Sequence, residues 1–476
     1  MKPVKIGDSG RKLLRAIAQG KPHDLKNATI DAELLRRVVL GLPLSGSDGS
    51  LLGGVRRLFQ PADSHCACPR TAVGISIRNA VIDGTLDLSS ATGEEGGPMC
   101  PLEFEACTFN HGFVGANARF SRLSFKNCSF VHPWPARRGN RATIELSGAA
   151  IDSDLHLAGI HPKGVERDDI LSRHRGKLLW IRLNGARIDG EIDLCNAHLR
   201  APPPSAREMS KDAEDALDLS LAEVRGDLQL LAARIEGRLK MRTTHVAGDV
   251  WMTGASCEDP GEQAVQIQGA RIEGFLMMDG GFTNSDKSGP FRSFKCRGAL
   301  KLEAAEIGRS LYLEDSIVRG PIDAPQLMVG GDMFLHAEVS GPIDLRGCRI
   351  GASLDMSKLN LAASAGKVSL KDGSIGRTLI IAQPDVPYEL VDVRELPLDH
   401  LAPFVSPRLQ VVETLWAMVR GGRDEHDEEV PLRRQLVQAA FLVEKTTFTE
   451  RIHHLDGHQE VLDRALPPER RWELGP

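Results

Sequence analysis

Arginine side chains cluster beside a tryptophan in two polar stretches of this chain. The first stretch reads VHPWPARRGNR over 131–141, and the second reads IHPKGVERDDILSRHRGK over 160–177. Guanidinium groups bind phosphate and carboxylate groups well, and Arg and Trp often anchor protein interfaces. We therefore predict a partner-binding site made of Trp134, Arg137, Arg138, Arg141, Lys163, Arg167, Arg173 and Arg175. The alternative is that both stretches are solvated loops that bind nothing, because loops are polar by default.

Two groups of histidine and cysteine have the chemistry of metal ligands. They are His65, Cys66 and Cys68 in the sequence HCACP, and His453, His454 and His458 in the sequence HHLDGH. A structural zinc site needs four ligands, which usually come as two spaced pairs. The first group has no second pair nearby and the second lies in a polar segment, so we predict no metal site and no cofactor.

Aspartates recur beside the apolar stretches and raise the question of polysaccharide hydrolysis. They are Asp83, Asp87, Asp152, Asp154, Asp189 and Asp193. Two carboxylates about 5–9 Å apart can hydrolyse a glycosidic bond. The alternative is that these residues are outward polar groups at turns, where Asp is common. The sequence has no nucleophile elbow, phosphate-binding loop or dinucleotide fingerprint, so we predict no catalytic residue.

These residues lie among copies of one repeated phrase, Ile/Val-x-Gly-x-Leu-x-Leu/Met. It reads IDGTLDL from Ile82 and IGRSLYL from Ile307, and successive copies begin 11 residues apart at Val224, Ile235 and Val246. Apolar and polar residues alternate within a copy, which predicts short strands. The recurring Gly predicts a bend before each strand. Repetition at a fixed period indicates a solenoid.

The insertions indicate how many copies make one coil. We pair the strands as Ile75 with Leu86, Ile144 with Leu155, Ile181 with Ile192, and so on to Val368 with Leu379. Every long insertion then follows the second member of a pair, which predicts two copies and about 22 residues per coil, with loops on one edge. The two Arg-rich stretches and the insertions at 200–215, 257–263 and 283–292 should share that edge. The less regular interval 102–130 fits one or two Phe-rich coils.

Two copies carry a family resemblance. The sequences GARIDG from Gly185 and GARIEG from Gly269 resemble bacterial proteins whose repeats read G-A-R-I-x-G-x-L-x-L, and through them the pentapeptide-repeat class. The resemblance covers about residues 71–383. It implies a mainly β fold, a right-handed quadrilateral parallel β-helix, and it says almost nothing about activity.

The first 70 residues differ from the repeats in charge and in pattern. They hold 12 Lys/Arg and 6 Asp/Glu, a net charge of +6. Helical spacing over 11–19 and 31–40, with Asp31 as an N-cap, predicts a basic helical cap for the stack. The solenoid itself, residues 71–384, holds 36 Lys/Arg and 40 Asp/Glu, a net charge of −4.

The last segment, residues 385–476, abandons the repeat. It holds 11 Lys/Arg and 18 Asp/Glu, a net charge of −7, and prolines punctuate its first part. Apolar residues at helical spacing over 408–420 and 431–446 predict a helical hairpin. We expect this acidic region to pack on the last coil or to be presented to a partner.

Composition argues against a membrane span and for a reducing compartment. No stretch reaches 18 apolar residues, and the first ten residues lack the apolar core of a signal peptide. Nine cysteines, an odd number, lie mostly inside repeat copies and are predicted to be buried thiols. We therefore expect a cytoplasmic protein.

These observations predict a non-enzymatic interaction scaffold. It would bind a macromolecular partner, most readily a protein, through the looped edge and the terminal helices, a role compatible with bacterial defence or regulation. Three alternatives stay open: a hydrolase or lyase that acts on polysaccharides, an inhibitor that mimics nucleic acid, and direct nucleic-acid binding by the basic N-terminus and loops. The near-neutral solenoid argues against mimicry, because a mimic needs an acidic surface.

Overall fold

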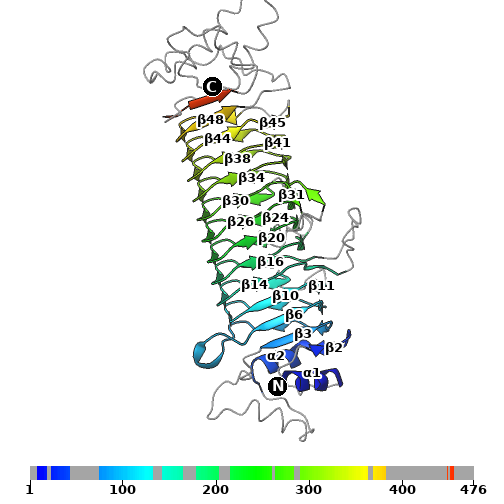
Figure 1. Cartoon of the computed structure of the whole chain (residues 1–476). Helices are drawn as coiled ribbons and strands as arrows, with labels where there is room; N and C mark the ends of the chain where they lie inside the picture. Colours follow the sequence, from blue (N-terminus) through cyan, green and yellow to red (C-terminus); the bar gives the residue numbers. More distant parts are fainter. Residues whose placement is uncertain are drawn as a thin grey trace, which may run out of the picture. The chain divides into compact units, whose positions relative to one another are not determined.

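The computed structural model confirms a mainly β, right-handed parallel β-helix. It describes residues 8–18, 23–42, 74–131, 142–163, 178–202, 215–259, 263–282, 290–362, 368–381, 447–448 and 451–454. The chain divides into two compact units, Met1–Gly261 and Glu262–Pro476. In each unit, short parallel strands stack as the coils of a helix (Figure 1).

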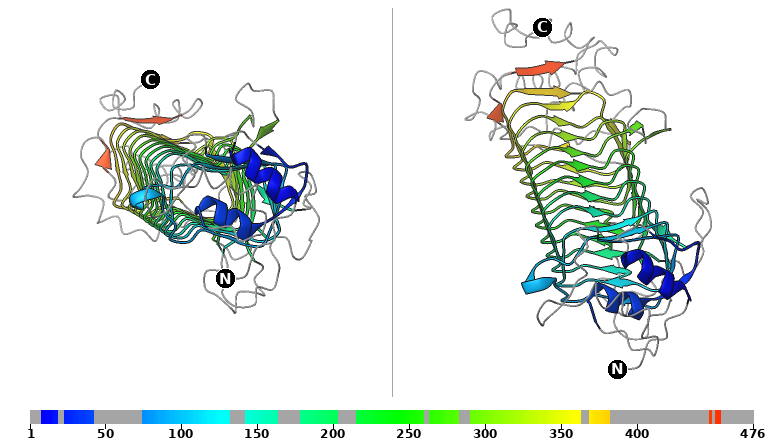
Figure 2. Two further views of the ribbon diagram at one scale, coloured as in Figure 1. Left: turned by 90° about the horizontal axis from the view of Figure 1, so that it is seen from below. Right: turned by 60° about the horizontal axis from the view of Figure 1, so that its bottom comes forward.

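Each coil passes four faces, which we label A to D in chain order (Figure 2). In the first unit, face A holds β1 (His23–Asp24), β3 (Ile75–Arg78), β6 (Leu102–Glu105), β10 (Leu123–Lys126), β14 (Leu155–His156), β18 (Ile192–Asp193), β22 (Leu228–Gln229) and β26 (Val250–Trp251). Face B holds β2 (Thr29–Asp31), β4 (Val81–Asp83), β7 (Thr108–Phe109), β11 (Ser129–Phe130), β15 (His161–Pro162), β19 (His198–Arg200), β23 (Arg234–Glu236) and β27 (Ser256–Glu258). Face C holds β5 (Leu86–Asp87), β8 (Phe113–Val114), β12 (Ile144–Glu145), β16 (Ile181–Arg182), β20 (Asp215–Asp218) and β24 (Arg238–Lys240). Face D holds β9 (Arg119–Phe120), β13 (Ala150–Ile151), β17 (Arg187–Ile188), β21 (Glu223–Val224) and β25 (His245–Val246).

The second unit repeats this plan. Face A holds β30 (Leu276–Met277), β36 (Leu311–Tyr312), β40 (Met333–Phe334), β44 (Leu354–Met356), β48 (Thr378–Ile381) and β50 (Arg451–His454). Face B holds β33 (Lys295–Arg297), β37 (Ser316–Val318), β41 (Ala337–Val339) and β45 (Asn360–Leu361). Face C holds β28 (Val265–Gln266), β34 (Leu300–Lys301), β38 (Ile322–Asp323), β42 (Ile343–Asp344) and β46 (Val368–Ser369). Face D holds β29 (Arg271–Ile272), β35 (Glu306–Ile307), β39 (Met328–Val329), β43 (Arg349–Ile350), β47 (Ser374–Ile375) and β49 (Thr447–Phe448).

Two helices precede the first coils, as predicted. They are α1 (Asp8–Ala18) and α2 (Ala32–Val39). Asp31 is the N-cap of α2, because its carboxylate accepts the Glu33 amide hydrogen at 2.8 Å. The segment is more than a helical cap, however, since β1 and β2 pair in parallel with β3 and β4 of the following coil.

Strand pairing confirms two repeat copies per coil. Leu228 pairs with Val250, and Leu300 pairs with Ile322, so each partner lies 22 residues further along the chain. The repeated Gly lies at the bend before a strand, as predicted, and it has a second role. A Cβ added to Gly226 would lie 2.8 Å from backbone atoms of Gly190 in the preceding coil, so close stacking of coils requires a residue without a side chain there.

The Phe-rich interval 102–130 is a regular part of the first unit. Its six phenylalanines, Phe104, Phe109, Phe113, Phe120, Phe125 and Phe130, are all buried inside the coils. Rings from neighbouring coils stack, with centroids 5.3 Å apart for Phe104 and Phe125 and 4.9 Å apart for Phe109 and Phe130. Aromatic stacking therefore replaces aliphatic ladders in these coils.

The first strand pair departs from the predicted phase. Ile75 lies on face A and Leu86 on face C, whereas Ile144 lies on face C and its partner Leu155 on face A. The insertion after Leu86 contains a short 3-10 helix, η1 (Glu94–Gly96), and precedes face A rather than leaving from the predicted edge. The prediction was wrong for this insertion because both copies of a coil carry the same motif, so the motif does not tell which copy comes first.

The insertion at 283–292 also departs from the prediction. It follows β30 on face A and precedes β33 on face B, and its ends form an antiparallel hairpin of β31 (Gly281–Phe282) and β32 (Phe291–Arg292). The other insertions named above follow face B strands, as predicted. An antiparallel hairpin needs no further coil to pair with, so it can form at any corner.

A distant segment adds two strands to the second unit. β49 pairs in parallel with β47, and β50 pairs with β48, which places Phe448 beside Ile375 and Ile452 beside Leu379. The predicted helical hairpin over 408–420 and 431–446 lies outside the described residues.

Candidate functional site

Three long insertions of the first unit leave from the same corner of successive coils. Each begins after a strand of face B and ends before a strand of face C: after β11, β15 and β19, and before β12, β16 and β20. Because β12, β16 and β20 pair with one another, the three insertions start on adjacent coils. We call this corner of the first unit the looped edge.

The looped edge carries the predicted binding residues. Lys163 is described and exposed, directly after β15. Trp134, Arg137, Arg138, Arg141, Arg167, Arg173 and Arg175 lie outside the described residues. The topology therefore brings the two Arg-rich insertions to one edge, and the arrangement of their side chains stays a prediction.

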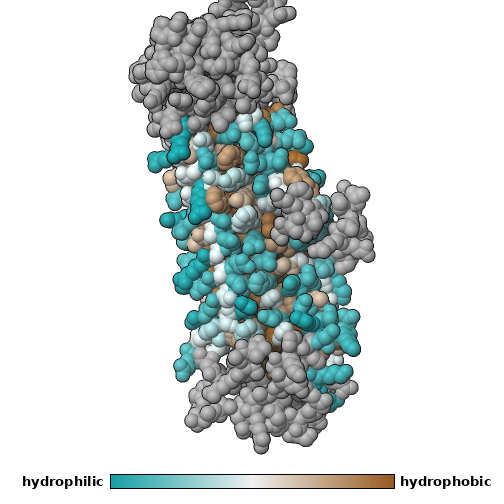
Figure 3. All heavy atoms as spheres, viewed as in Figure 1, coloured by the Kyte–Doolittle hydropathy of each residue, from teal (hydrophilic) through white to brown (hydrophobic). Residues whose placement is uncertain are grey.

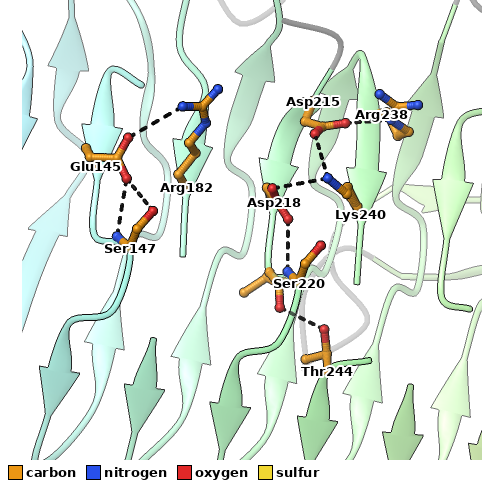
Figure 4. Close-up of polar contacts among 10 residues, drawn as sticks. Glu145, Ser147, Arg182, Asp215, Asp218, Ser220, Arg238, Lys240 and Thr244 are labelled. Carbon is orange, nitrogen blue, oxygen red and sulfur yellow. Dashed lines mark hydrogen bonds and ion pairs between the residues drawn. The ribbon is translucent and has the colours of Figure 1, made fainter. Parts of the chain in front are cut away.

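A buried group of ion pairs lies on face C beside the looped edge (Figure 4). The Asp215 carboxylate accepts from Arg238 Nε at 2.5 Å and from Lys240 Nζ at 3.3 Å, and Lys240 also reaches Asp218 at 3.4 Å. Asp215 is only 2% exposed. Burial raises the pKa of Asp215, and the Arg238 guanidinium opposes that rise. The carboxylate is thus held by two cations instead of being open to a substrate.

The same face has a second ion pair two coils earlier, between β12 and β16. Glu145 lies 3.9 Å from Arg182 and accepts hydrogen bonds from the backbone and hydroxyl of Ser147 (Figure 4). Carboxylates and cations balance along these strands, and the ion pairs link the face C strands to which the insertions return. Sequence reasoning missed it, although the recurring acid and base at outward positions of face C was a usable signal.

The predicted aspartate ladder is present but largely neutralised. Asp152 pairs with Arg119 at 3.0 Å, and Asp189 pairs with Arg187 at 3.0 Å and with Arg225 at 3.4 Å. The remaining members are also bonded: Asp83 to Asn110, Asp87 to Ser89, Asp154 to Arg122, and Asp193 to His156. Outward aspartates therefore serve mainly to link coils.

Near His156, two neighbouring carboxyl groups have pKa values that are shifted in opposite directions. His156 lies between Asp154 at 3.8 Å and Asp193 at 3.7 Å. Burial, followed by the charge of Asp154, raises the pKa of Glu191. Burial also acts to raise the pKa of Asp193, but the nearby His156 imidazole and a hydrogen bond from the Cys195 amide outweigh it and bring that pKa below its ordinary value. A raised and a lowered carboxyl side by side is the pattern of an acid and base pair.

The neighbouring thiol does not complete a nucleophilic site. Burial and the adjacent Asp193 raise the pKa of Cys195 to about 12. At neutral pH this group is therefore a thiol rather than the nucleophilic thiolate.

The second unit brings a serine, a histidine and two carboxylates together on face A. His336 Nδ1 lies 3.1 Å from Glu314, and Nε2 lies 3.1 Å from Asp355 and 3.3 Å from the Ser357 hydroxyl. The residues come from different coils, which is why no sequence motif revealed them; the spacing of 21 residues between His336 and Ser357, one coil, was the available signal.

This array does not have the geometry of a nucleophilic triad. Asp355 occupies the nitrogen that would take the Ser357 proton, and it also accepts the Ser357 amide hydrogen at 2.8 Å. A general base needs that nitrogen free for its nucleophile. His336 instead joins carboxylates of neighbouring coils.

The candidate metal ligands do not form a described site. His453 and His454 belong to strand β50. The other four residues lie outside the described part of the chain: His65, Cys66, Cys68 and His458. Within the described part of the chain, no three His, Cys, Asp or Glu residues converge as a metal site. Over the same residues, no helix has the length and apolar character needed to cross a membrane. No family model, no curated protein and no solved structure matches this chain.

Proposed function

We propose that this protein is a non-enzymatic interaction scaffold that binds a partner protein through the looped edge of its first unit. One observation carries the proposal: the Arg-rich insertions leave from one corner on adjacent coils. A stack of paired coils is rigid before binding, so little conformational entropy is lost when a partner docks. Arg side chains with Trp134 would supply the anchors.

The contacts beside the looped edge support this role. The Asp215, Arg238 and Lys240 group ties β20 to β24, next to the corner where the insertion before β20 returns. A partner-binding loop gains precision when its ends are fixed by a rigid element. Carboxylates already bonded to cations are better suited to holding strands than to attacking a substrate.

The compartment and family also remain part of the proposal. Cys107, Cys128, Cys296 and Cys348 are buried thiols inside the coils, which supports a reducing cytoplasm. The repeats resemble those of the bacterial pentapeptide-like β-helices, and a scaffold role in bacterial defence or regulation accords with that resemblance. The predicted C-terminal helical hairpin would be a second contact.

Affinity enrichment of the tagged chain from the cells that produce it tests the looped edge. We expect Arg137→Glu with Arg138→Glu to reduce recovery of the partner at least tenfold and to leave thermal unfolding unchanged. The matched control is Arg271→Glu with Arg349→Glu, which makes the same charge change at two exposed positions of face D in the second unit. Equal loss of the partner in both variants would contradict a site at the looped edge.

Polysaccharide hydrolysis is the second candidate, and the split pKa values of Glu191 and Asp193 favour it. Glu191 would be the proton donor and Asp193 the base. The test is a screen of glycans for reducing-end release. Glycan turnover by the parent that is lost in Glu191→Gln but kept in Asp249→Asn would support a hydrolase. If the parent turns over no glycan, the hydrolase hypothesis is rejected.

Nucleic-acid mimicry has less support. In the described first unit, acids on the outer faces alternate with bases, as in the Arg119–Asp152 and Arg187–Asp189 pairs. Such alternation lacks the continuous negative charge of a phosphate backbone. A topoisomerase inhibition assay tests mimicry, and a gel shift that weakens with salt would instead indicate direct nucleic-acid binding.

A further inference from the structure

Aromatic side chains of the second unit lie outside the coils. Tyr312 on β36 and Phe334 on β40 occupy outward positions of face A, and their rings stack with centroids 5.0 Å apart at 12°. The ring centroid of Phe275, just before β30, lies 6.0 Å from that of Tyr312. With Met277 on β30, these residues form what we call the aromatic stripe.

Outward positions of this kind normally carry polar groups. In the first unit, the outward residues of face A include Ser124, His156, Asp193 and Gln229, with Trp251 on the last strand as an aromatic exception, and the six phenylalanines of 102–130 are buried. Solvent-facing aromatic residues gathered on one face mark an interaction site. Figure 3 shows hydrophobic residues among hydrophilic ones on the face that it presents.

We propose that the aromatic stripe binds the same stripe of a second copy of this chain, about a twofold axis parallel to the stripe. Aromatic residues, Met and Arg are enriched in protein interfaces, and a twofold axis is the commonest symmetry of protein dimers. This surface is separate from the looped edge, so the dimer does not depend on the proposed function.

The repeat distance of the stripe favours a second copy over other partners. Rings recur at 5.0 Å, close to the strand spacing of about 4.8 Å. Stacking covers the faces that Tyr312 and Phe334 turn toward each other and leaves ring edges to point outward. A sugar binds ring faces and finds none free between these two rings. A second stripe has the same rung spacing, and a twofold axis parallel to the stripe keeps every ring at its own level, so the ring edges of the two copies meet level by level along the whole stripe.

Charges on the two flanks of the stripe support this symmetry. Arg309 precedes β36, is exposed and lies over the Phe275 ring at 5.1 Å. Among the described residues, no carboxylate forms an ion pair with the Arg309 guanidinium. Glu314 follows the same strand; one of its carboxylate oxygens contacts His336 at 3.1 Å, and 42% of its side chain is exposed. An axis parallel to the stripe lays one flank on the other, which places Arg309 opposite the partner's Glu314.

The hairpin after β30 extends the same surface. Phe291 on β32 is 50% exposed. Its ring lies against the corner at Gly280, where an added Cβ would meet Phe291 Cζ at 2.8 Å. The apolar surface thus runs from face A to this hairpin, which enlarges the area a second copy would cover.

Analytical ultracentrifugation of the full chain over a hundredfold concentration range tests the proposal. We expect a monomer–dimer equilibrium and at least a tenfold weaker dimer in Phe334→Glu, with the same circular dichroism and thermal unfolding as the parent. Met328→Glu is the matched control, because Met328 is an outward apolar residue of face D in the same coil. It should dimerise like the parent. A parent that stays monomeric, or equal effects of the two variants, overturns the proposal.

A charge exchange tests the symmetry itself. Arg309→Glu alone and Glu314→Arg alone should each weaken the dimer, because like charges then face each other across the axis. The double variant should recover dimerisation to within about threefold of the parent, since each pair is again of opposite charge. A double variant weaker than either single variant would overturn the twofold arrangement.

Discussion

Leu228 illustrates how strictly the interior of a coil selects apolar side chains. It is fully buried on β22, between Ile192 and Val250 of the neighbouring coils. A carboxylate placed there would lack both water and a partner. We expect Leu228→Asp to lower the free energy of unfolding by roughly 3–5 kcal/mol or to prevent folding.

Urea unfolding followed by circular dichroism measures this change. The control is Ala247→Asp, an outward position where Asp189 stands two coils earlier. It should shift the free energy of unfolding by less than about 0.5 kcal/mol. Equal stability of the Leu228→Asp protein and the parent would refute the inward assignment.

Leu221 shows the opposite case, a residue poorly matched to its position. It has a φ of 60° and is 60% exposed, so it bears left-handed strain without the gain of burial. The same corner holds Asn117 and Gly185 in other coils. We therefore expect Leu221→Asn to raise the free energy of unfolding by about 1 kcal/mol. A thermal melt against Glu223→Asn, two residues away, checks this; equal melting temperatures in both would contradict it.

His156 on face A lies between carboxylates of adjacent coils, and this contact depends on pH. The contact with Asp193 raises the pKa of His156 above its ordinary 6.5, and Asp154 and Glu191 add to the effect. A raised folded pKa means that the protonated form is stabilised by folding. Its contribution is fully present below the unfolded pKa and is lost as pH rises through the folded pKa.

The parent and His156→Gln should therefore differ most in free energy of unfolding at about pH 5.5, and the difference should shrink by about pH 9. Urea titrations at several pH values measure it. Asp193→Asn should reduce the pH dependence, because it removes the main partner of His156. A difference in free energy of unfolding between parent and variant that grows as pH rises would contradict this prediction.

At the scale of strands, the repeat period was sufficient to predict the coil. Alternation in copies such as Leu311-Tyr312-Leu313 indicated which side chains face inward, and Leu311 and Leu313 are buried. It was harder to predict which copy of the motif lies on which face. Ile75 and Leu86 carry the same pattern as later pairs, yet they lie on faces A and C in the reverse order. Equivalent motifs on opposite faces hold no information about which comes first.

The side-chain groups were less accessible from sequence. His336 and Ser357 meet only because one coil has 21 residues there, and Asp215 meets Arg238 of the next coil at a shift in the register between β20 and β24. Insertions change the spacing from coil to coil, so lateral partners cannot be aligned before the register is known.

At the scale of the whole molecule, each unit combines uniform coils with a surface that breaks the pattern. In the first unit the break is the looped edge, where insertions leave from adjacent coils. In the second unit it is the aromatic stripe together with the hairpin that holds Phe291. Coils fix strand positions, and function in such a protein is carried by what departs from the repeat.

Site-specific photo-crosslinking most directly tests the claim that the looped edge binds a partner. A benzophenone amino acid replaces Lys163 at that edge or Arg187 on face D of the same unit, both exposed. We predict one partner crosslinked from position 163, no such product from position 187, and loss of the product with Arg137→Glu and Arg138→Glu. The same partner crosslinked equally from both positions, or from position 187 alone, would contradict the account.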